Sequence, residues 1–79
     1  MRWQDYVERN PKVMVGKPVI KGTRITVELV LELLSDGASE QDILSSYPHL
    51  KAEHIRAALA YAAASLATDE VVFLGEDAA

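Results

Sequence analysis

The sequence predicts a mainly α-helical protein, a three-helix, helix-turn-helix-like domain with a short N-terminal β-hairpin or arm. A chain of 79 residues is too short to divide into two hydrophobic cores. After residue 25, apolar side chains recur in three segments with the period of an α-helix. Before residue 25, the apolar runs are short and separated by Gly and Pro, which is typical of a hairpin or an arm.

Composition narrows the classes of protein that remain. With no cysteine, the chain has no disulfides, no thiolate catalysis and no cysteine-based zinc site, and two histidines are too few for a three-histidine metal centre. The longest apolar stretch, residues 57–64, is too short to span a membrane, and no signal peptide opens the chain. We therefore expect a cytoplasmic binding or regulatory domain without a cofactor.

The first 25 residues are expected to form the extended front of the domain. Short β-rich runs occur at residues 13–15, 19–20 and 24–25. Each is too short to build a sheet of its own, so we predict a hairpin or an arm. A helical turn is also expected near residues 3–8.

The first helix is predicted to begin after Thr26, a favourable N-cap residue, and to end at Asp36-Gly37. Its inward side chains follow the i, i+3, i+4, i+7 pattern: Val27, Val30, Leu31 and Leu34. Leucines at positions 29 and 33 widen this stripe until the helix is apolar on most sides. Such a helix needs cover from its neighbours.

The second helix is predicted to open at Ser39, which forms a capping-box variant with Asp42, and to end before Pro48. The third is predicted over residues 52–66, with Leu50 packed against its first turn. Its apolar stripe is expected to comprise Ile55, Ala58, Leu59, Ala62 and Leu66. A short helix, a tight turn and a longer helix form the spacing of a helix-turn-helix.

The N-terminus of the third helix lacks the usual capping residues. Lys51 stands at the expected N-cap position, and His54 occupies the place where an acidic residue usually follows. We expect the cap to be lost at a cost of about 1 kcal/mol. The same exposed face offers Glu53 and Arg56 and then little but alanine, so it supports major-groove readout poorly.

Charge is divided unevenly along the chain. Residues 1–24 hold six basic and two acidic side chains, a net charge of +4, whereas residues 25–79 carry −8. This asymmetry is typical of a chain with one end for a polyanion and the other for a cationic surface, although chance clustering on a solvated surface remains an alternative. We expect DNA to be held through its phosphates by five residues: Lys17, Lys21, Arg24, Lys51 and Arg56.

Nothing in the sequence indicates catalysis. It contains no Ser-His-Asp set, no Walker loop and no dinucleotide-binding glycine motif. The adjacent acids at 69–70 and 76–77 are conceivable metal ligands, but acids in a tail are usually solvated. We predict that the protein is not an enzyme.

A specific motif lies at the end of the basic N-terminal segment. Residues 15–25 read Val-Gly-Lys-Pro-Val-Ile-Lys-Gly-Thr-Arg-Ile, which resembles the G-K-P-x-I-x-G-T-R-I signature of domain-of-unknown-function family four-three-three, a VapB-like antitoxin family. Similar features follow at Asp36-Gly37-Ala38-Ser39-Glu40, at Tyr47-Pro48-His49-Leu50 and at residues 55–61. The similarity covers roughly residues 5–66.

The resemblance implies a homodimeric helix-turn-helix protein with a β-hairpin at its front. It further implies a partner, a PIN-like toxin that is a metal-dependent ribonuclease, and repression of the shared operon through operator DNA. Two alternatives remain, namely a stand-alone DNA-binding repressor and a structural dimerisation module. The unpaired hairpin edges and the apolar first helix also favour a dimer in which residues 13–25 pair with or pack against a second copy.

The chain divides into a helix-turn-helix-like antitoxin domain, residues 1–67, and an acidic-apolar tail, residues 68–79. The tail places four apolar residues between acids, and we expect them to bind the toxin: Val71, Val72, Phe73 and Leu74. In the alternative interpretation, this block pairs back onto the front hairpin of its own domain. The Gly22-Thr23-Arg24 run likewise has an alternative to phosphate binding. In this alternative it is only a tight turn, and Arg24 caps it or pairs with an acid.

Overall fold

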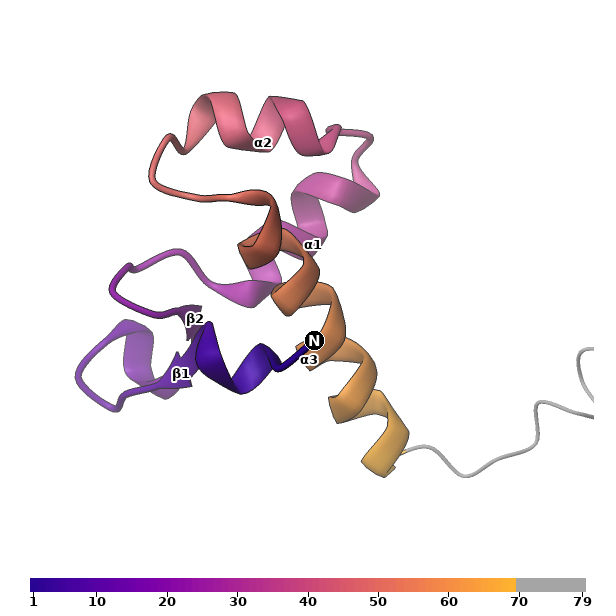
Figure 1. Ribbon diagram of the computed structural model, residues 1–79. Coiled ribbons are helices and arrows are strands. Elements are labelled where there is room, and N and C mark those ends of the chain that lie inside the picture. Colours follow the sequence, from indigo (N-terminus) through magenta and orange to yellow (C-terminus); the bar gives the residue numbers. More distant parts are fainter. Residues whose placement is uncertain (70–79) are drawn as a thin grey trace, which may run out of the picture.

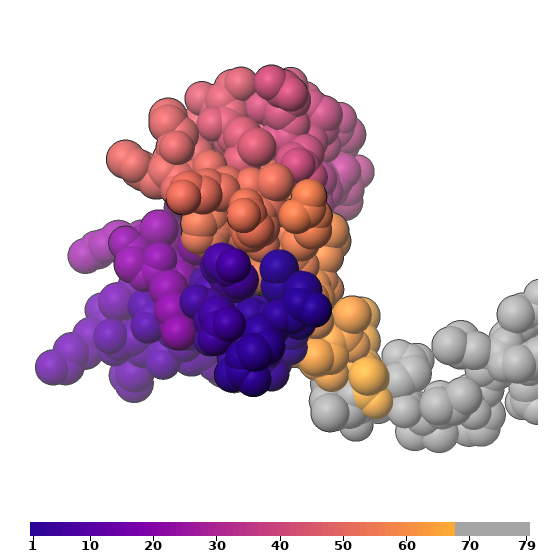
Figure 2. Space-filling model, in the orientation of Figure 1, coloured from indigo at the N-terminus to yellow at the C-terminus, as the bar shows by residue number. Residues whose placement is uncertain are grey.

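The computed structural model describes residues 1–69 and confirms a mainly helical fold with a short hairpin at the N-terminus (Figure 1). In chain order, the elements are η1 (Trp3–Asp5), β1 (Val7–Arg9), η2 (Met14–Gly16), β2 (Pro18–Ile20), α1 (Val27–Ser35), α2 (Glu40–Ser46) and α3 (Ala52–Asp69), where η denotes a 3-10 helix. The longest helix, α3, packs against α1 and against η1, and it also contacts β1 and α2. Figure 2 shows the indigo N-terminal segment lying directly against orange α3.

The hairpin is antiparallel and pairs Val7 with Ile20 and Arg9 with Pro18. Residues 13–15, predicted as a β run, form no strand: Met14 and Val15 lie in η2 and Val13 is its N-cap, so that prediction is wrong. Three backbone hydrogen bonds turn this segment: Val13 N–H to Asn10 C=O, Gly16 N–H to Val13 C=O and Lys17 N–H to Met14 C=O. The chain must reverse between the two strands, and these residues make the reversal. The helical turn expected over residues 3–8 is confined to η1, and β1 follows it.

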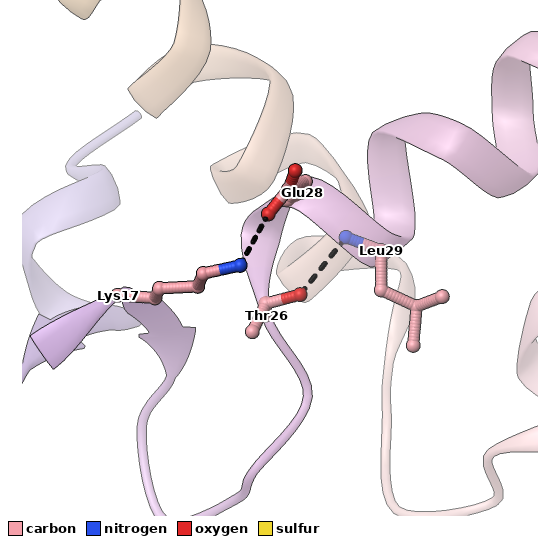
Figure 3. A network of polar contacts seen from close by, with 4 residues as sticks. All are labelled: Lys17, Thr26, Glu28 and Leu29. Atoms are coloured by element: carbon pink, nitrogen blue, oxygen red, sulfur yellow. Dashed lines mark hydrogen bonds and ion pairs between the residues drawn. The ribbon is translucent and has the colours of Figure 1, made fainter. Parts of the chain in front are cut away.

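Helix α1 is closed at both ends by local hydrogen bonds. The Thr26 hydroxyl accepts the Leu29 N–H at 2.9 Å, as its N-cap position predicts (Figure 3). At the other end, Gly37 takes a positive φ of 100°, which an L-residue with a side chain rarely adopts. The N–H groups of Gly37 and Ala38 then reach back to the carbonyls of Leu34 and Leu33, which is a Schellman motif.

Helix α2 begins with the predicted capping box. The Asp42 N–H donates to the Ser39 hydroxyl at 3.0 Å, and the Asp42 carboxylate accepts the Ser39 N–H at 2.9 Å. The pKa of Asp42 lies below its ordinary value of 3.8. The main cause is the hydrogen bond from the Ser39 backbone N–H, and the second is the hydrogen bond with the Ser39 side chain. The helix ends at Ser46, with Tyr47 as its C-cap, and so stops before Pro48 as expected.

The core lies where α1, α2 and α3 meet the hairpin. Leu50 and Ile55 are 4% and 2% exposed, in agreement with the predicted packing of Leu50 on the first turn of α3. Two fully buried alanines, Ala57 and Ala58, let α3 approach its neighbours closely. The buried cluster comprises Val7, Ile20, Val27, Val30, Ile43, Leu50, Ile55, Ala57 and Ala58.

The rotation of α3 about its axis differs from the predicted one. Leu59 and Leu66, expected to face inward, are 48% and 62% exposed. Ile55 and Ala58 are buried as predicted, but the rest of the inward face is formed by Ala57 and the half-buried Tyr61, whose ring meets Trp3 edge-on at 4.9 Å. In a helix so rich in alanine, the hydrophobic pattern is nearly uniform around the axis, so it does not fix which face turns inward.

Replacing Asp42 with Asn is expected to lower the Tm at pH 7, because a neutral amide accepts the Ser39 N–H less strongly than a carboxylate does. The folded-state pKa lies below the ordinary 3.8, so the stabilisation is present above that value and is lost as the pH falls through the folded pKa. The difference in Tm between the two proteins should therefore narrow in acid, as calorimetry at several pH values would measure. Glu40→Gln removes a charge from the same turn without touching Ser39 and serves as the control. A difference that is independent of pH would contradict this account.

Candidate nucleic-acid interface

The turn between β2 and α1 is held by the hydroxyl of Thr23. Its Oγ1 donates to the Ile20 carbonyl at 2.8 Å and accepts the Ile25 N–H at 3.0 Å. Gly22 occupies the left-handed region with a φ of 77°, and its N–H donates to the Glu8 carboxylate at 3.4 Å. The Gly22-Thr23 pair thus builds a tight turn from one positive-φ position and one bridging hydroxyl.

This turn exposes the two basic side chains that flank Gly22-Thr23. Lys21 and Arg24 are both exposed. Among residues 1–69, Arg24 has no hydrogen bond and no acidic partner, so its guanidinium does not hold the turn together. Thr23 does that instead, which leaves all five guanidinium N–H donors of Arg24 available to a ligand.

The start of α3 is capped by a histidine. The backbone N–H of Lys51 donates to Nδ1 of the His54 ring at 2.9 Å. The backbone N–H of His54 donates to the Lys51 carbonyl, also at 2.9 Å. His54 thus supplies the acceptor that Glu or Gln supplies in a capping box, so this half of the motif is present. The Lys51 side chain has no acceptor for the helix N–H groups, so the N-cap half is missing, as expected. The imidazole also packs edge-on against Tyr6, with ring centroids 5.5 Å apart.

Tyr6 joins these two basic segments. Its carbonyl accepts the Lys21 N–H at 2.8 Å, while its ring meets His54 at the start of α3. The turn that carries Lys21 and Arg24 therefore lies in the same region as the helix start that carries Lys51 and Arg56, both of which are exposed. Four of the five predicted DNA-binding residues are exposed on these two segments, and we call them the basic patch: Lys21, Arg24, Lys51 and Arg56.

Lys17 lies apart from the basic patch. It precedes β2, whereas Lys21 follows it, so about 13 Å of extended chain separates their backbones. The Lys17 ammonium pairs with Glu28 of α1, with Nζ 3.1 Å from Oε1 (Figure 3). Sequence reasoning did not detect this pair, because the two residues are eleven positions apart and lie on different elements.

The outer face of α3 beyond Arg56 presents few hydrogen-bonding groups. Its exposed side chains include Leu59, Ala63, Leu66 and Ala67. Alanine and leucine can contact a thymine methyl group but cannot form the bidentate hydrogen bonds that distinguish bases. The geometry therefore favours phosphate contacts from the basic patch over base readout by α3.

Sequence reasoning missed an apolar groove between α1 and α3. The groove has a volume of about 530 Å³, and its apolar lining includes Val27, Leu31, Tyr61, Ala62 and Leu66. Among residues 1–69, its charged lining residues are two carboxylates, Glu28 and Glu32. The sequence does contain Leu66, which lines the groove. It could have indicated the groove only if the inward face of α3 had been known, because Leu66 was expected in the core.

Three further sequence expectations concern metals, membranes and the tail. Over residues 1–69, no three His, Asp or Glu side chains cluster as a metal site would require. No helix in that range is both long and apolar enough to cross a bilayer. The four predicted toxin-binding residues, Val71, Val72, Phe73 and Leu74, lie outside the described residues.

Residues 7–62 match the sequence model of a family described as a protein of unknown function, DUF433. The chain belongs to the DUF433 family. The matched region begins at β1 and ends in α3 just after Tyr61, so it contains the hairpin, the basic patch, α1, α2 and the first part of α3. The resemblance inferred from residues 15–25 is thereby confirmed at the level of the family.

Two similar proteins place this DUF433 chain among longer relatives. An uncharacterized protein of Sinorhizobium fredii, y4eO, is 37% identical over 62 residues, which are 78% of this chain and 28% of y4eO. The crystal structure of a DUF433 member protein from Anabaena variabilis superposes with a TM-score of 0.70 at 34% identity, covering 73% of this chain and 57% of that one. The chain thus spans less than two thirds of the length of either relative.

Replacing His54 with Ala is expected to lower the free energy of unfolding by about 1 kcal/mol, because the Lys51 N–H loses its acceptor. His54→Gln, which places a favoured capping-box residue at the same position, should retain more of the stability. Urea unfolding measures both variants. His49→Ala removes the exposed histidine of the preceding turn and should change little. Equal losses for His54→Ala and His49→Ala would contradict the capping role.

Proposed function

We propose that this DUF433 protein is the antitoxin of a type II toxin-antitoxin pair, which represses its own operon by binding DNA and inhibits a PIN-like ribonuclease. In this proposal it acts in the cytoplasm as a homodimer, through binding and not catalysis. The observation that carries the DNA-binding part is the Thr23-bridged turn, which holds Lys21 and Arg24 exposed and is linked through Tyr6 to the start of α3. The antitoxin part rests on the resemblance of residues 15–25 to the antitoxin-like signature.

The basic patch is suited to a duplex backbone. Two of its four cations lie on a turn fixed by internal hydrogen bonds, so less conformational freedom is lost when a phosphate binds there. A homodimer would present eight such cations on two surfaces related by a two-fold axis, which matches the symmetry of a palindromic operator. The net charge of −4 does not prevent this, since the acids lie mainly in other parts of the sequence.

Toxin inhibition is assigned to the tail on chemical grounds. A ribonuclease groove that guides RNA is basic along the path of the backbone. The tail carries acids on both sides of Val71-Val72-Phe73-Leu74 and no basic residue, so it has the charge to occupy such a path and the apolar block to hold it there.

A second candidate function, a dimerisation module without a toxin, is favoured by one specific observation. The apolar groove and the exposed Leu59 and Leu66 form a surface suited to protein contact and unsuited to DNA. The neighbouring reading frame separates the candidates. A chain with the spaced aspartates of a PIN-type nuclease would favour the antitoxin, and its absence would favour the module or a stand-alone repressor.

Replacing both Lys21 and Arg24 with Ala should weaken binding to every DNA duplex at least tenfold at low salt. If four phosphate contacts are lost per dimer, the slope of log affinity against log salt should fall by roughly 3.6. Fluorescence anisotropy with the upstream intergenic duplex and with a random duplex measures both effects. The matched control, Arg2→Ala with Lys17→Ala, removes two charges already paired with Asp5 and Glu28. Equal effects of the two double variants would show that only net charge matters and that the basic patch is not a site.

Removing residues 70–79 should leave a folded, DNA-binding protein, because α3 ends at Asp69 and the buried core with the side chains packed against it lies within residues 3–61. The truncated chain should no longer inhibit the ribonuclease encoded beside it, as assayed by cleavage of a labelled RNA. Circular dichroism checks that the fold persists. If the truncated chain unfolds, the tail is structural and the alternative, pairing with the front hairpin, is favoured. If the folded truncated chain still inhibits, another surface binds the toxin.

A further inference from the structure

The loop between β1 and β2 carries the most exposed large hydrophobic side chain of the described residues. Val15 is 92% exposed and its neighbour Met14 is 41% exposed. Both have a positive φ, 48° at Met14 and 56° at Val15. A β-branched residue is rarely found there, because its Cβ substituents crowd the backbone. An apolar pair held in a strained turn and facing water suggests a contact surface.

Charge surrounds this apolar pair. Residues 9–17 include Arg9, Lys12 and Lys17 and no acid. Arg9 closes the loop by donating its Nε N–H to the Gly16 carbonyl at 2.9 Å, and Lys17 is paired with Glu28. Lys12 is exposed, and its ammonium has no acidic partner in the described part of the chain. We call residues 10–17 the basic loop.

The groove between α1 and α3 has the complementary character. Its lining is largely apolar, and its charged residues are Glu28 and Glu32. Glu28 is paired with Lys17 of the same chain, whereas Glu32 has no cationic partner among residues 1–69. An apolar segment that carries positive charge therefore fits this groove better than one that carries negative charge.

The basic loop and the groove adjoin each other on the molecular surface. Pro18 lines the groove and directly follows the loop. Three residue steps lead from Val15 to Pro18, so the backbone of Val15 lies at most about 10 Å from that of this groove residue. Val15 does not fill the groove of its own chain, since it is almost fully exposed. Adjacent complementary features on one surface can be exchanged between two copies around a two-fold axis, which closes the assembly.

We propose that the groove between α1 and α3 is the receptor for the basic loop of a second copy of this chain, with exchange in both directions. Met14 and Val15 of each copy enter the apolar groove of the other, and Lys12 lies opposite the partner's unpaired Glu32. This inference rests on the homodimer of the proposed function and specifies the surfaces that form it. The basic patch takes no part, so it stays open to DNA.

Cross-linking provides the direct test, because the chain has no cysteine of its own. Two chains with tags of different size, one carrying Val15→Cys and the other Ala62→Cys, are mixed and treated with a short bis-maleimide. A covalent product containing both tags is expected at micromolar concentration. Ser45→Cys places a thiol on an exposed part of α2 away from the groove, and its mixture with the Val15→Cys chain should give no product above background. Equal yields from the two mixtures would overturn the proposal.

Light scattering tests the energetics. Wild-type protein should have the mass of two chains, and Val15→Glu should raise the dimer dissociation constant at least tenfold. Circular dichroism should show that this monomeric variant is folded, because Val15 is exposed in the single chain. Lys12→Glu and Glu32→Lys should each weaken the dimer, and the two together should restore it. Failure of this rescue, or a Val15→Glu variant that dimerises as well as the wild type, would overturn the proposal.

Two other occupants give distinct results. If an Ala62→Cys, Leu74→Cys chain cross-links within itself, the tail occupies the groove and the proposal is wrong. If Val15→Glu leaves the mass unchanged but abolishes DNA binding, the loop is a DNA contact and the proposal is again wrong. A monomeric wild type would overturn both this inference and the homodimer, yet the effect of Lys21 and Arg24 on DNA binding would still test the proposed function independently.

Discussion

The junction at Thr26 is the interaction on which the arrangement of this small protein depends. Its hydroxyl caps α1 through the Leu29 N–H, and its backbone bridges to Val19 of β2. The neighbouring Ile20 N–H donates to the Ile25 carbonyl at 2.9 Å. A helix and a strand of three residues are thereby joined over a six-residue connection. Because Thr26 is only 8% exposed, these polar bonds are shielded from water, where they are worth more.

Different kinds of surface lie at the two ends of strand β2. At its N-terminal end, Lys17 pairs with Glu28 and Pro18 lines the apolar groove. At its C-terminal end, Lys21 is fixed to Tyr6 and the turn exposes Arg24. Three strand residues thus separate a surface suited to protein from one suited to a polyanion. The sequence motif that identifies the family spans both ends, which accounts for its mixture of Gly, Pro and basic residues.

Features with local signals were predictable from the sequence, and features with distant partners were not. The caps at Thr26 and Ser39 and the left-handed Gly37 each depend on residues within four positions, and all three were predicted. The partner of Lys17 lies on another element, so sequence reasoning placed it with the DNA-binding residues. Strand β1 was missed because three residues are too few to show an alternating pattern. All four residues of the basic patch were predicted from the sequence, but the link between its two segments depends on Tyr6, which contacts Lys21 and His54.

Helix α2 is attached to the domain by far less apolar contact than the other helices. Of its seven residues, only Ile43 is buried, and its two ends are fixed by bonds to immediately adjacent residues, Ser39 at the start and Tyr47 at the end. A unit of this kind can open by itself, because its capping box is made within the unit and few contacts beyond it are broken. When α2 opens, the N-terminal segment keeps its contacts with α3, because Trp3 packs on Tyr61 and Tyr6 packs on His54. The amides of α2 would then exchange with solvent hydrogen far sooner than those of α3, and the first helix of the helix-turn-helix would be a separately folding segment of the domain.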